Sequence, residues 1–294
     1  MFDTLKSRIY QGEQAIPDIR KATIGEKFRG LPLIDKQNCS NCGKCSSVCP
    51  TNALTAFPSL SNGIPMKRII LSKKSRFLYP LPWPICQLSV EASYIHPMNR
   101  GGFTKQRINQ DVSIDLGKCI FCGDCERECP NNSIKFTNFH KVASTSRENL
   151  VVDSNTTIEN YTIIAIKSSK QIKKLFGKSL KLRQVSAGGC NGCEMELNAC
   201  SNVNFDMGRF GIDIVASPRH ADGIIITGPI TENMADALED AYRSTPDPKI
   251  IILAGACAIS GGVFQNSDKL KRDFIEKYKI DLYIPGCPVH PLTV

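Results

Sequence analysis

Residues 39–50 read CSNCGKCSSVCP, and residues 119–130 read CIFCGDCERECP. In each stretch three cysteines are separated by two residues, a fourth follows after three more, and a proline comes directly after the fourth. A short polar turn and an apolar run follow each proline, TNALTAF in the first stretch and NNSIKF in the second. The two stretches are an internal repeat, and closely spaced thiols in a repeated pattern indicate metal binding.

This spacing is typical of bacterial two-cluster ferredoxins. Three closely spaced thiolates bind three corners of a 4Fe-4S cubane, and the cysteine before the proline reaches the neighbouring cubane. We therefore predict two clusters with crossed ligands. The predicted ligands of the first, called site 1, are Cys39, Cys42, Cys45 and Cys129. Those of the second, called site 2, are Cys119, Cys122, Cys125 and Cys49.

A pair of zinc sites is the alternative, because C-x2-C pairs also suit tetrahedral zinc. Zinc ribbons do not require three cysteines at two-residue gaps followed by Cys-Pro, so the spacing favours iron-sulfur clusters. Gly43 and Gly123 stand where the chain must turn tightly for its amides to point at cluster sulfurs. Hydrogen bonds of this kind tune the reduction potential.

The composition places the chain among folded proteins of a reducing compartment. It has 294 residues, 41% of them hydrophobic, with 14 cysteines and a net charge of +9. Its longest apolar runs are far shorter than the roughly 20 residues of a transmembrane helix. The first residues lack the apolar core of a secretory signal. We therefore expect a cytoplasmic protein whose cysteines bind metal rather than form disulfides.

Four regions are predicted along the chain. An N-terminal arm spans residues 1–34, and an α+β domain of the bacterial two-cluster ferredoxin type spans residues 35–140. A polar segment at 141–178 is the predicted linker. Residues 179–294 alternate short β-rich runs with helical ones, which predicts a flavodoxin-like α/β domain with a parallel sheet.

The expected strands of the C-terminal domain are the runs at 212–217, 222–228, 249–255 and 281–286, and the clearest helix is 231–244. Open α/β sheets bind ligands beyond the carboxyl ends of their strands. Cys257 and Cys287 follow two of these runs directly, so both are expected at such ends.

A long insert separates the two cysteine runs. Within it, residues 66–110 carry eight lysines and arginines against the single acid Glu91, and so hold most of the net charge. Two interpretations remain open: docking on an anionic lipid surface or acidic partner subunit, and an insertion without a dedicated role. No nucleic-acid recognition motif accompanies the charge, so no nucleic-acid partner is expected.

Four more cysteines stand in the glycine-containing loops AGGCNGCEMEL, AGACAISGG and IPGCPVHP. They are Cys190, Cys193, Cys257 and Cys287. A third four-thiolate cluster, called site 3, is the most economical explanation, and a redox-active C-x2-C dithiol with two structural cysteines is the alternative. Cys86 and Cys200 have no cysteine partner at metal-site spacing and are expected as ordinary buried or free thiols.

The stretches LRQVSAGGCNGCEMEL, RFGIDIVASPRHADGIIITGP, TPDPKIIILAGACAISGG and YIPGCPVHP resemble a known family. It is the small electron-transfer subunit, complex I 20 kDa-like, of membrane-bound nickel-iron hydrogenases of the formate-hydrogenlyase type and of complex I. The likeness covers residues 179–294. Residues 24–139 resemble the two-cluster ferredoxin subunit of the same complexes, so the chain looks like a fusion of two subunits.

The resemblance implies three 4Fe-4S clusters in one electron-transfer path, with site 3 nearest to the catalytic partner. It also implies that Glu194 occupies the family's acidic position and takes part in proton transfer. The other interpretation of Glu194 is a carboxylate stabilised by a helix N-terminus. Arg219, His220 and His290 match family positions that serve the subunit interface rather than ligation.

Two departures from the family are visible. Complex I small subunits carry two adjacent cysteines where this chain has Cys190-x2-Cys193, which favours the hydrogenase-like branch over the quinone-reducing one. Family members also continue through a helix after the last motif, whereas this chain stops at Val294, and a shortened end would weaken the site around Cys287.

No further pair of C-x2-C motifs remains to bind nickel, and no glycine-rich nucleotide loop occurs. We therefore expect a subunit that is not catalytic alone and that works in a group 4 nickel-iron hydrogenase. Its expected partners are a catalytic large subunit, membrane-arm subunits that hold it on the inner face of the cell membrane, and a soluble electron donor or acceptor. The alternatives are the equivalent subunit of a complex I-like NADH:quinone oxidoreductase, a hydrogenase relative without its metal centre, and a free polyferredoxin carrier or redox sensor.

Overall fold

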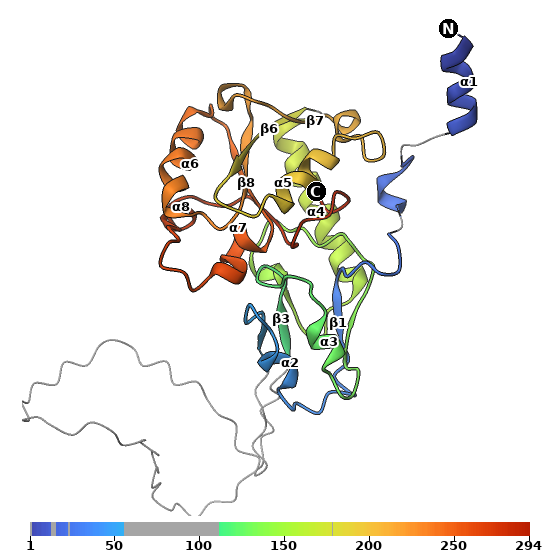
Figure 1. Ribbon diagram of the computed structural model, residues 1–294, viewed down its shortest axis with the longest axis vertical. Coiled ribbons are helices and arrows are strands. Elements are labelled where there is room, and N and C mark those ends of the chain that lie inside the picture. Colours follow the sequence, from blue (N-terminus) through green and yellow to red (C-terminus); the bar gives the residue numbers. More distant parts are fainter. Residues whose placement is uncertain (1, 13–15, 23, 56–111, 178) are drawn as a thin grey trace, which may run out of the picture.

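The computed structural model describes residues 2–12, 16–22, 24–55, 112–177 and 179–294 (Figure 1). The basic insert at 66–110, with Cys86 and Glu91, lies outside the described residues. No helix within the described ranges has both the length and the hydropathy that crossing a bilayer requires.

The N-terminal half consists of two short cysteine-bearing helices, α2 and α3, and two small antiparallel sheets. Strand β1 pairs with β4, and β3 lies between β2 and β5. The expected α+β ferredoxin-like domain is confirmed. Its elements are β1 (Pro32–Ile34), α2 (Lys44–Ser47), β2 (Leu54–Thr55), β3 (Ser113–Asp115), α3 (Asp124–Arg127), β4 (Ile134–Phe136), η2 (Glu148–Leu150) and β5 (Val151–Val152).

The segment expected as an N-terminal arm contains more than an irregular chain. It begins with helix α1 (Phe2–Gln11), which lies apart from the rest in Figure 1, and continues through η1 (Ile19–Lys21). Its last three residues, which form β1, pair with β4 across the ferredoxin core. The repeat therefore needs this preceding strand, because β1 covers an edge of β4 that would otherwise lack backbone partners.

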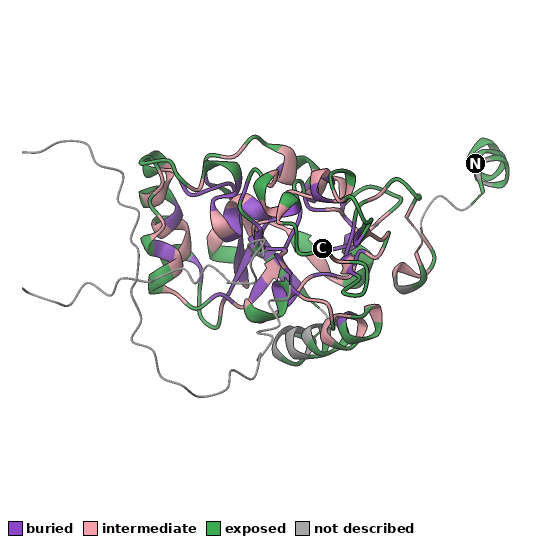
Figure 2. Ribbon diagram, turned by 90° about the horizontal axis from the view of Figure 1, so that it is seen from below, coloured by how far each residue is buried: buried purple, intermediate pink, exposed green. Residues whose placement is uncertain are grey.

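The C-terminal half is a parallel five-stranded sheet in the order β10-β9-β8-β6-β7. This is the flavodoxin order, so the predicted α/β fold is confirmed. Strands β8 and β9 are buried along their whole length, as expected for a parallel sheet between helical layers (Figure 2). The strands are β6 (Leu180–Ser186), β7 (Ile212–Ile214), β8 (Gly223–Thr227), β9 (Ile250–Ala254) and β10 (Leu282–Ile284). The remaining elements are α5 (Gly192–Ala199), η3 (Met207–Phe210), η4 (Pro218–His220), α6 (Glu232–Ser244), α7 (Ala256–Ser260), η5 (Gly262–Phe264) and α8 (Asp273–Lys277).

Two elements differ from the sequence expectations. Strand β6, which lies between β8 and β7, is not among the predicted runs, because its leucines alternate with charged and polar residues instead of forming an apolar run. The predicted linker at 141–178 contains β5 and the 19-residue helix α4 (Ile158–Phe176). Ordered elements therefore join the two halves.

The two halves pack directly on each other. Ser144 and Tyr283 exchange two backbone hydrogen bonds of 3.0 and 2.8 Å, so the chain leaving the N-terminal half runs beside β10. Gly117 has no room for a side chain, because a Cβ atom there would lie 2.7 Å from Cγ2 of Ile259 on α7. Leu116 and Ile259 belong to one continuous hydrophobic core.

The segment that joins the halves contains a buried histidine. His140 is only 5% exposed, and its ring stacks on Phe139 with a centroid distance of 6.4 Å. Burial, together with the charges of Lys141 and His290, lowers the pKa of His140 to about 4. The imidazole is therefore neutral near pH 7 in the folded protein.

This burial predicts an acid-sensitive contribution to folding. An unfolded histidine titrates near pH ~6.5, so the contribution is complete above that pH and is lost as the pH falls toward 4, by at most about 3 kcal/mol. His140→Gln should flatten the pH dependence of the free energy of unfolding between pH 7 and 4.5, measured by urea denaturation. His220→Gln, at an exposed histidine, is the control. An unchanged slope in His140→Gln would contradict the assignment.

Candidate metal centres

The two cysteine runs have the same backbone conformation. Residues at corresponding positions of both runs adopt positive φ angles, which lets each loop reverse direction within a few residues. The pairs are Asn41 and Phe121 (53° and 55°), Gly43 and Gly123 (73° and 80°), and Asn52 and Asn132 (49° and 50°). The tight turns predicted at Gly43 and Gly123 are confirmed. Each glycine directly precedes the helix that carries the third cysteine of its run.

The structure brings the four cysteines of site 1 together. Burial raises the pKa of the Cys45 thiol, and the neighbouring thiols of Cys39, Cys129 and Cys42 raise it further. All four cysteines line one small cavity. Its apolar walls are Ile34, Val112 and Ile134. Cys129 reaches this group from the second run, as the crossed pattern predicts.

Site 2 has the complementary arrangement. Burial raises the pKa of Cys119 to about 12, with further contributions from Cys125, Cys49 and Cys122. Cys49 thus reaches the second run from the first. Burial also raises the pKa of Cys125 to about 12, and Cys45 of site 1 is among the thiols that add to this shift. The two sites are therefore neighbours through Cys45 and Cys125.

Backbone amides point at sulfur atoms in both sites. The amide of Ala53 donates to Cys49 Sγ and that of Ser133 donates to Cys129 Sγ, each at 3.2 Å, and the Phe121 amide donates to Cys119 Sγ at 3.3 Å. Such donors stabilise the thiolate, which is the form that ligates metal.

Cys129 shows the effect of these amides. Burial is the largest influence and raises its pKa, but hydrogen bonds from the amides of Ser133 and Asn131 bring the pKa below its usual value.

Site 3 lies at the carboxyl edge of the parallel sheet. Cys190 follows β6, Cys257 lies in α7 after β9, and Cys287 follows β10, while Cys193 lies in α5. The prediction that Cys257 and Cys287 stand at strand ends is confirmed. Chain order changes direction between β6 and β8, which is the switch point where open α/β sheets bind their ligands.

The four thiols of site 3 are mutual neighbours. Burial, together with the nearby Glu194, Cys287 and Cys257, raises the pKa of Cys193 to about 12. Burial likewise raises the pKa of Cys257 to about 11, with Cys287 and Cys190 adding to it. A Cβ atom at position 255 would lie 2.6 Å from Cys193 Sγ, so only glycine leaves room for that sulfur.

The donor sets fit the predicted clusters in their chemistry. Each site gathers four thiols from loops and short helices, and the four thiols of site 1 line one cavity. Among the residues that the structure describes, no three or more His, Cys, Asp or Glu side chains are arranged to hold a single metal ion. The assignment of each cysteine as a ligand stays a prediction.

Glu194 lies beneath site 3. Its carboxylate is 5% exposed and accepts hydrogen bonds from Ser186 Oγ and Thr227 Oγ1, both at 2.6 Å. Burial raises the pKa of Glu194, but these two hydroxyls outweigh it and hold the pKa below the usual value. The residue stands in the first turn of α5, beside Cys193. Both predicted roles fit this position, and its role in proton transfer stays a prediction.

The other residues named from the sequence lie in different surroundings. Arg219 and His220 are exposed in η4. His290 contacts the ring of Phe28, with centroids 5.0 Å apart, and thereby joins the N-terminal segment to the last residues of the chain. Cys200 is buried at the end of α5 and donates to the Glu196 carbonyl at 3.3 Å.

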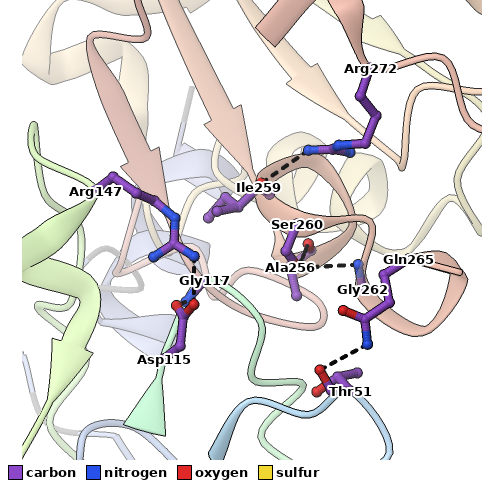
Figure 3. A network of polar contacts seen from close by, with 10 residues as sticks. All are labelled: Thr51, Asp115, Gly117, Arg147, Ala256, Ile259, Ser260, Gly262, Gln265 and Arg272. Carbon is purple, nitrogen blue, oxygen red and sulfur yellow. Dashed lines mark hydrogen bonds and ion pairs between the residues drawn. The ribbon is translucent and has the colours of Figure 1, made fainter. Parts of the chain in front are cut away.

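Two polar residues that the sequence did not single out contact the loops of these sites (Figure 3). Gln265 donates to the carbonyl of Thr51, two residues after Cys49, at 2.9 Å. Arg272 reaches the carbonyls at the end of α7, which carries Cys257. Both lie in polar stretches whose composition is typical of solvent-exposed segments, so nothing in the sequence distinguishes them from ordinary surface residues.

Comparison with known proteins matches both halves. The family of the 20 kDa subunit of NADH ubiquinone oxidoreductase matches residues 190–294, and a 4Fe-4S dicluster domain matches residues 31–130. The twelve cysteines of sites 1, 2 and 3 all lie within these two ranges.

Three curated relatives match the C-terminal part. The probable membrane-bound hydrogenase subunit mbhJ of Pyrococcus furiosus is 39% identical over 124 residues, covering 42% of this chain and 74% of the relative. Formate hydrogenlyase subunit 7 of Escherichia coli K12 is 43% identical over 128 residues, covering 44% and 50%. An NADH-quinone oxidoreductase subunit of Bacteroides thetaiotaomicron is 42% identical over 100 residues, covering 34% and 51%.

The chain thus spans about half the length of the last two relatives and most of the first. It belongs to the family of the NADH ubiquinone oxidoreductase 20 kDa subunit, joined in this chain to a preceding 4Fe-4S dicluster domain.

Proposed function

We propose that this chain is the iron-sulfur electron-transfer subunit of a membrane-associated oxidoreductase, and that it passes single electrons through three 4Fe-4S clusters to or from a catalytic large subunit. The observation that carries the proposal is a shared cavity: Cys122 of site 2 and Cys287 of site 3 line the same space of about 330 Å³. Two cysteine sites that border one cavity are close enough to act in sequence.

The neighbour relations give the three sites an order. Site 1 meets site 2 through Cys45 and Cys125, and site 2 meets site 3 across the shared cavity. The aromatic rings of Phe28 and Phe121 belong to the lining of that cavity. We therefore place site 2 in the middle of the path.

Residues next to the site 2 cysteines also contact the segment that follows Cys257. Thr51 accepts the Gln265 hydrogen bond on one side, and on the other Gly117 packs against Ile259.

Each bound cluster would supply a one-electron redox couple, while the protein fixes the spacing between clusters and excludes water from them. Burial of Cys45, Cys119, Cys125 and Cys193 serves this exclusion.

The ends of the path are open to partners. Cys190 and Cys287 of site 3 are exposed, and Met195, two residues after Cys193 in α5, is 65% exposed. We assign this face to the catalytic large subunit. At the other end Cys42 of site 1 is exposed, and we assign that end to a soluble electron donor or acceptor. Membrane-arm subunits would hold the assembly on the inner face of the cell membrane.

Within this function we favour a group 4 nickel-iron hydrogenase of the formate-hydrogenlyase type. The Cys190-x2-Cys193 spacing supports it, as do relatives named as membrane-bound hydrogenase and formate hydrogenlyase subunits. The second candidate is a complex I-like NADH:quinone oxidoreductase, favoured by the relative named as an NADH-quinone oxidoreductase subunit. The catalytic partner decides between them.

The cluster count is tested by removing one thiol of site 3. Cys257→Ser should lower the iron content of the anaerobically reconstituted chain from about twelve to about eight atoms, because one cubane loses a ligand. Electron paramagnetic resonance of the reduced protein should keep two ferredoxin-type signals.

The buried Cys200 supplies the matched control. Cys200→Ser should leave the iron content unchanged, since the Cys200 thiol donates a hydrogen bond to the Glu196 carbonyl and is assigned to no site. Loss of all three signals in Cys257→Ser, or of none, would show that the cysteines are partitioned wrongly.

The order of the sites predicts which clusters interact magnetically. In fully reduced protein, Cys257→Ser should narrow the site 2 signal and slow its relaxation. It should leave the site 1 signal unchanged, because site 2 is the site that we place next to site 3, across the shared cavity. Cys39→Ser should alter site 2 but not site 3. If site 1 responds to Cys257→Ser as strongly as site 2, the proposed order is wrong.

The type of complex is tested by the reductant that fills the clusters in the purified native assembly. For a hydrogenase, molecular hydrogen should reduce all three clusters without NADH or quinol. Reduction by NADH, or by quinol alone, would instead identify the complex I-like assembly. A chain isolated as a stable monomer with all clusters would favour a free polyferredoxin.

A further inference from the structure

Arg272 makes four hydrogen bonds to backbone carbonyls around site 3. One terminal nitrogen of its guanidinium donates to the carbonyls of Pro229 and Cys257 at 2.9 and 3.2 Å. The other donates to those of Ala258 and Ile259 at 2.8 and 3.0 Å. The side chain thus joins the end of helix α7 to the loop that contains Pro229 (Figure 3 shows the contact with Ile259).

Helix α7 carries a predicted ligand, Cys257. Helix α7 is only five residues long, and the carbonyl of Cys257 accepts from the amide of Gly261, just past the helix end, at 2.8 Å. Arg272 supplies donors to three consecutive carbonyls, beginning with that of Cys257 itself. The guanidinium therefore holds the helix end in place.

The loop that contains Pro229 follows β8 at the switch point of the sheet. Ile230 adopts a left-handed φ of 63°, which is strained for a β-branched residue. Its amide donates to the Ala187 carbonyl at 3.0 Å, and its own carbonyl accepts from the amide of Lys271 at 2.9 Å. Together with the bond to Pro229, the segment around Arg272 fixes this strained turn.

This strained turn also contacts the loop of another predicted ligand. A Cβ atom on Gly189 would lie 3.0 Å from the Cα of Gly228, so the two backbones touch. Gly189 directly precedes Cys190. Through Pro229 and Gly228 on one side and α7 on the other, Arg272 therefore links the positions of Cys190 and Cys257.

We propose that Arg272 is a positioning residue of site 3, which fixes the Cys257 helix relative to the Cys190 loop and places a permanent positive charge beside the cluster. This inference rests on the proposed function, because it assumes a redox-active cluster at site 3.

The two parts of this role are separable by substitution. A cluster gains negative charge on reduction, so a nearby cation raises its reduction potential, and the planar fork of arginine reaches several carbonyls that one ammonium cannot. Arg272→Met removes both the charge and the hydrogen bonds, whereas Arg272→Lys keeps the charge but loses the fork that reaches all four carbonyls. Lys271→Met is the matched control, because it removes an exposed charge one residue away.

The test is an anaerobic redox titration of the reconstituted full chain, followed by electron paramagnetic resonance and by iron analysis. Arg272→Met should shift the site 3 potential to a more negative value and broaden its signal, with sites 1 and 2 unchanged. Arg272→Lys should restore the potential but keep the broadened signal. Lys271→Met should match the unmodified chain in both properties.

Other outcomes are equally informative. If Arg272→Met loses the site 3 iron while Lys271→Met keeps it, the positioning role is supported. If Arg272→Lys matches the unmodified chain in both potential and line shape, or if Arg272→Met does so, the role is overturned. Unmodified protein with only eight iron atoms would overturn the three-cluster function itself, and this is established before any variant is made.

Discussion

The structure of this protein depends on one requirement, which each of the three sites must meet: four thiols have to be placed around one point in a largely buried setting. Burial raises the pKa values of Cys119, Cys125 and Cys193 to about 12, and the neighbouring thiols of each site add to the shift. Such thiols resist ionisation, yet metal binding needs thiolates. Amides aimed at sulfur, as at Cys119 and Cys129, and the cation of Arg272 near Cys257 offset part of this cost.

The two halves meet this constraint with different architectures. In the N-terminal half, a repeated loop with left-handed residues at matching positions curls around its own cluster site and exchanges one cysteine with its copy. In the C-terminal half, loops after β6, β9 and β10 meet because parallel strands end at one edge. The first solution is local in sequence and the second is set by topology, which explains why their motifs differ in length and spacing.

The same difference explains what the sequence could predict. The crossed grouping of Cys49 and Cys129 followed from spacing alone, because a rigid local motif fixes the geometry of its residues. The strand ends at Cys257 and Cys287 followed from apolar runs. Strand β6 and helix α4 did not, since their residues mix apolar with charged side chains. The contacts of Arg272 and Gln265 could not be predicted, because their partners are backbone carbonyls. A sequence does not show where the carbonyls of distant segments converge.

Site 2 is the least replaceable of the three, because its two loops are bound to both neighbours. Cys125 of site 2 lies near Cys45 of site 1, while Thr51 and Gly117, which flank the site 2 cysteines, lie against the α7–η5 segment that follows Cys257. A shift of that segment therefore alters site 3 and its distance to site 2 together. Fusion of the two subunits into one chain suits this geometry. The continuous core across Leu116 and Ile259 holds fixed a spacing that two separate subunits would have to restore at each assembly.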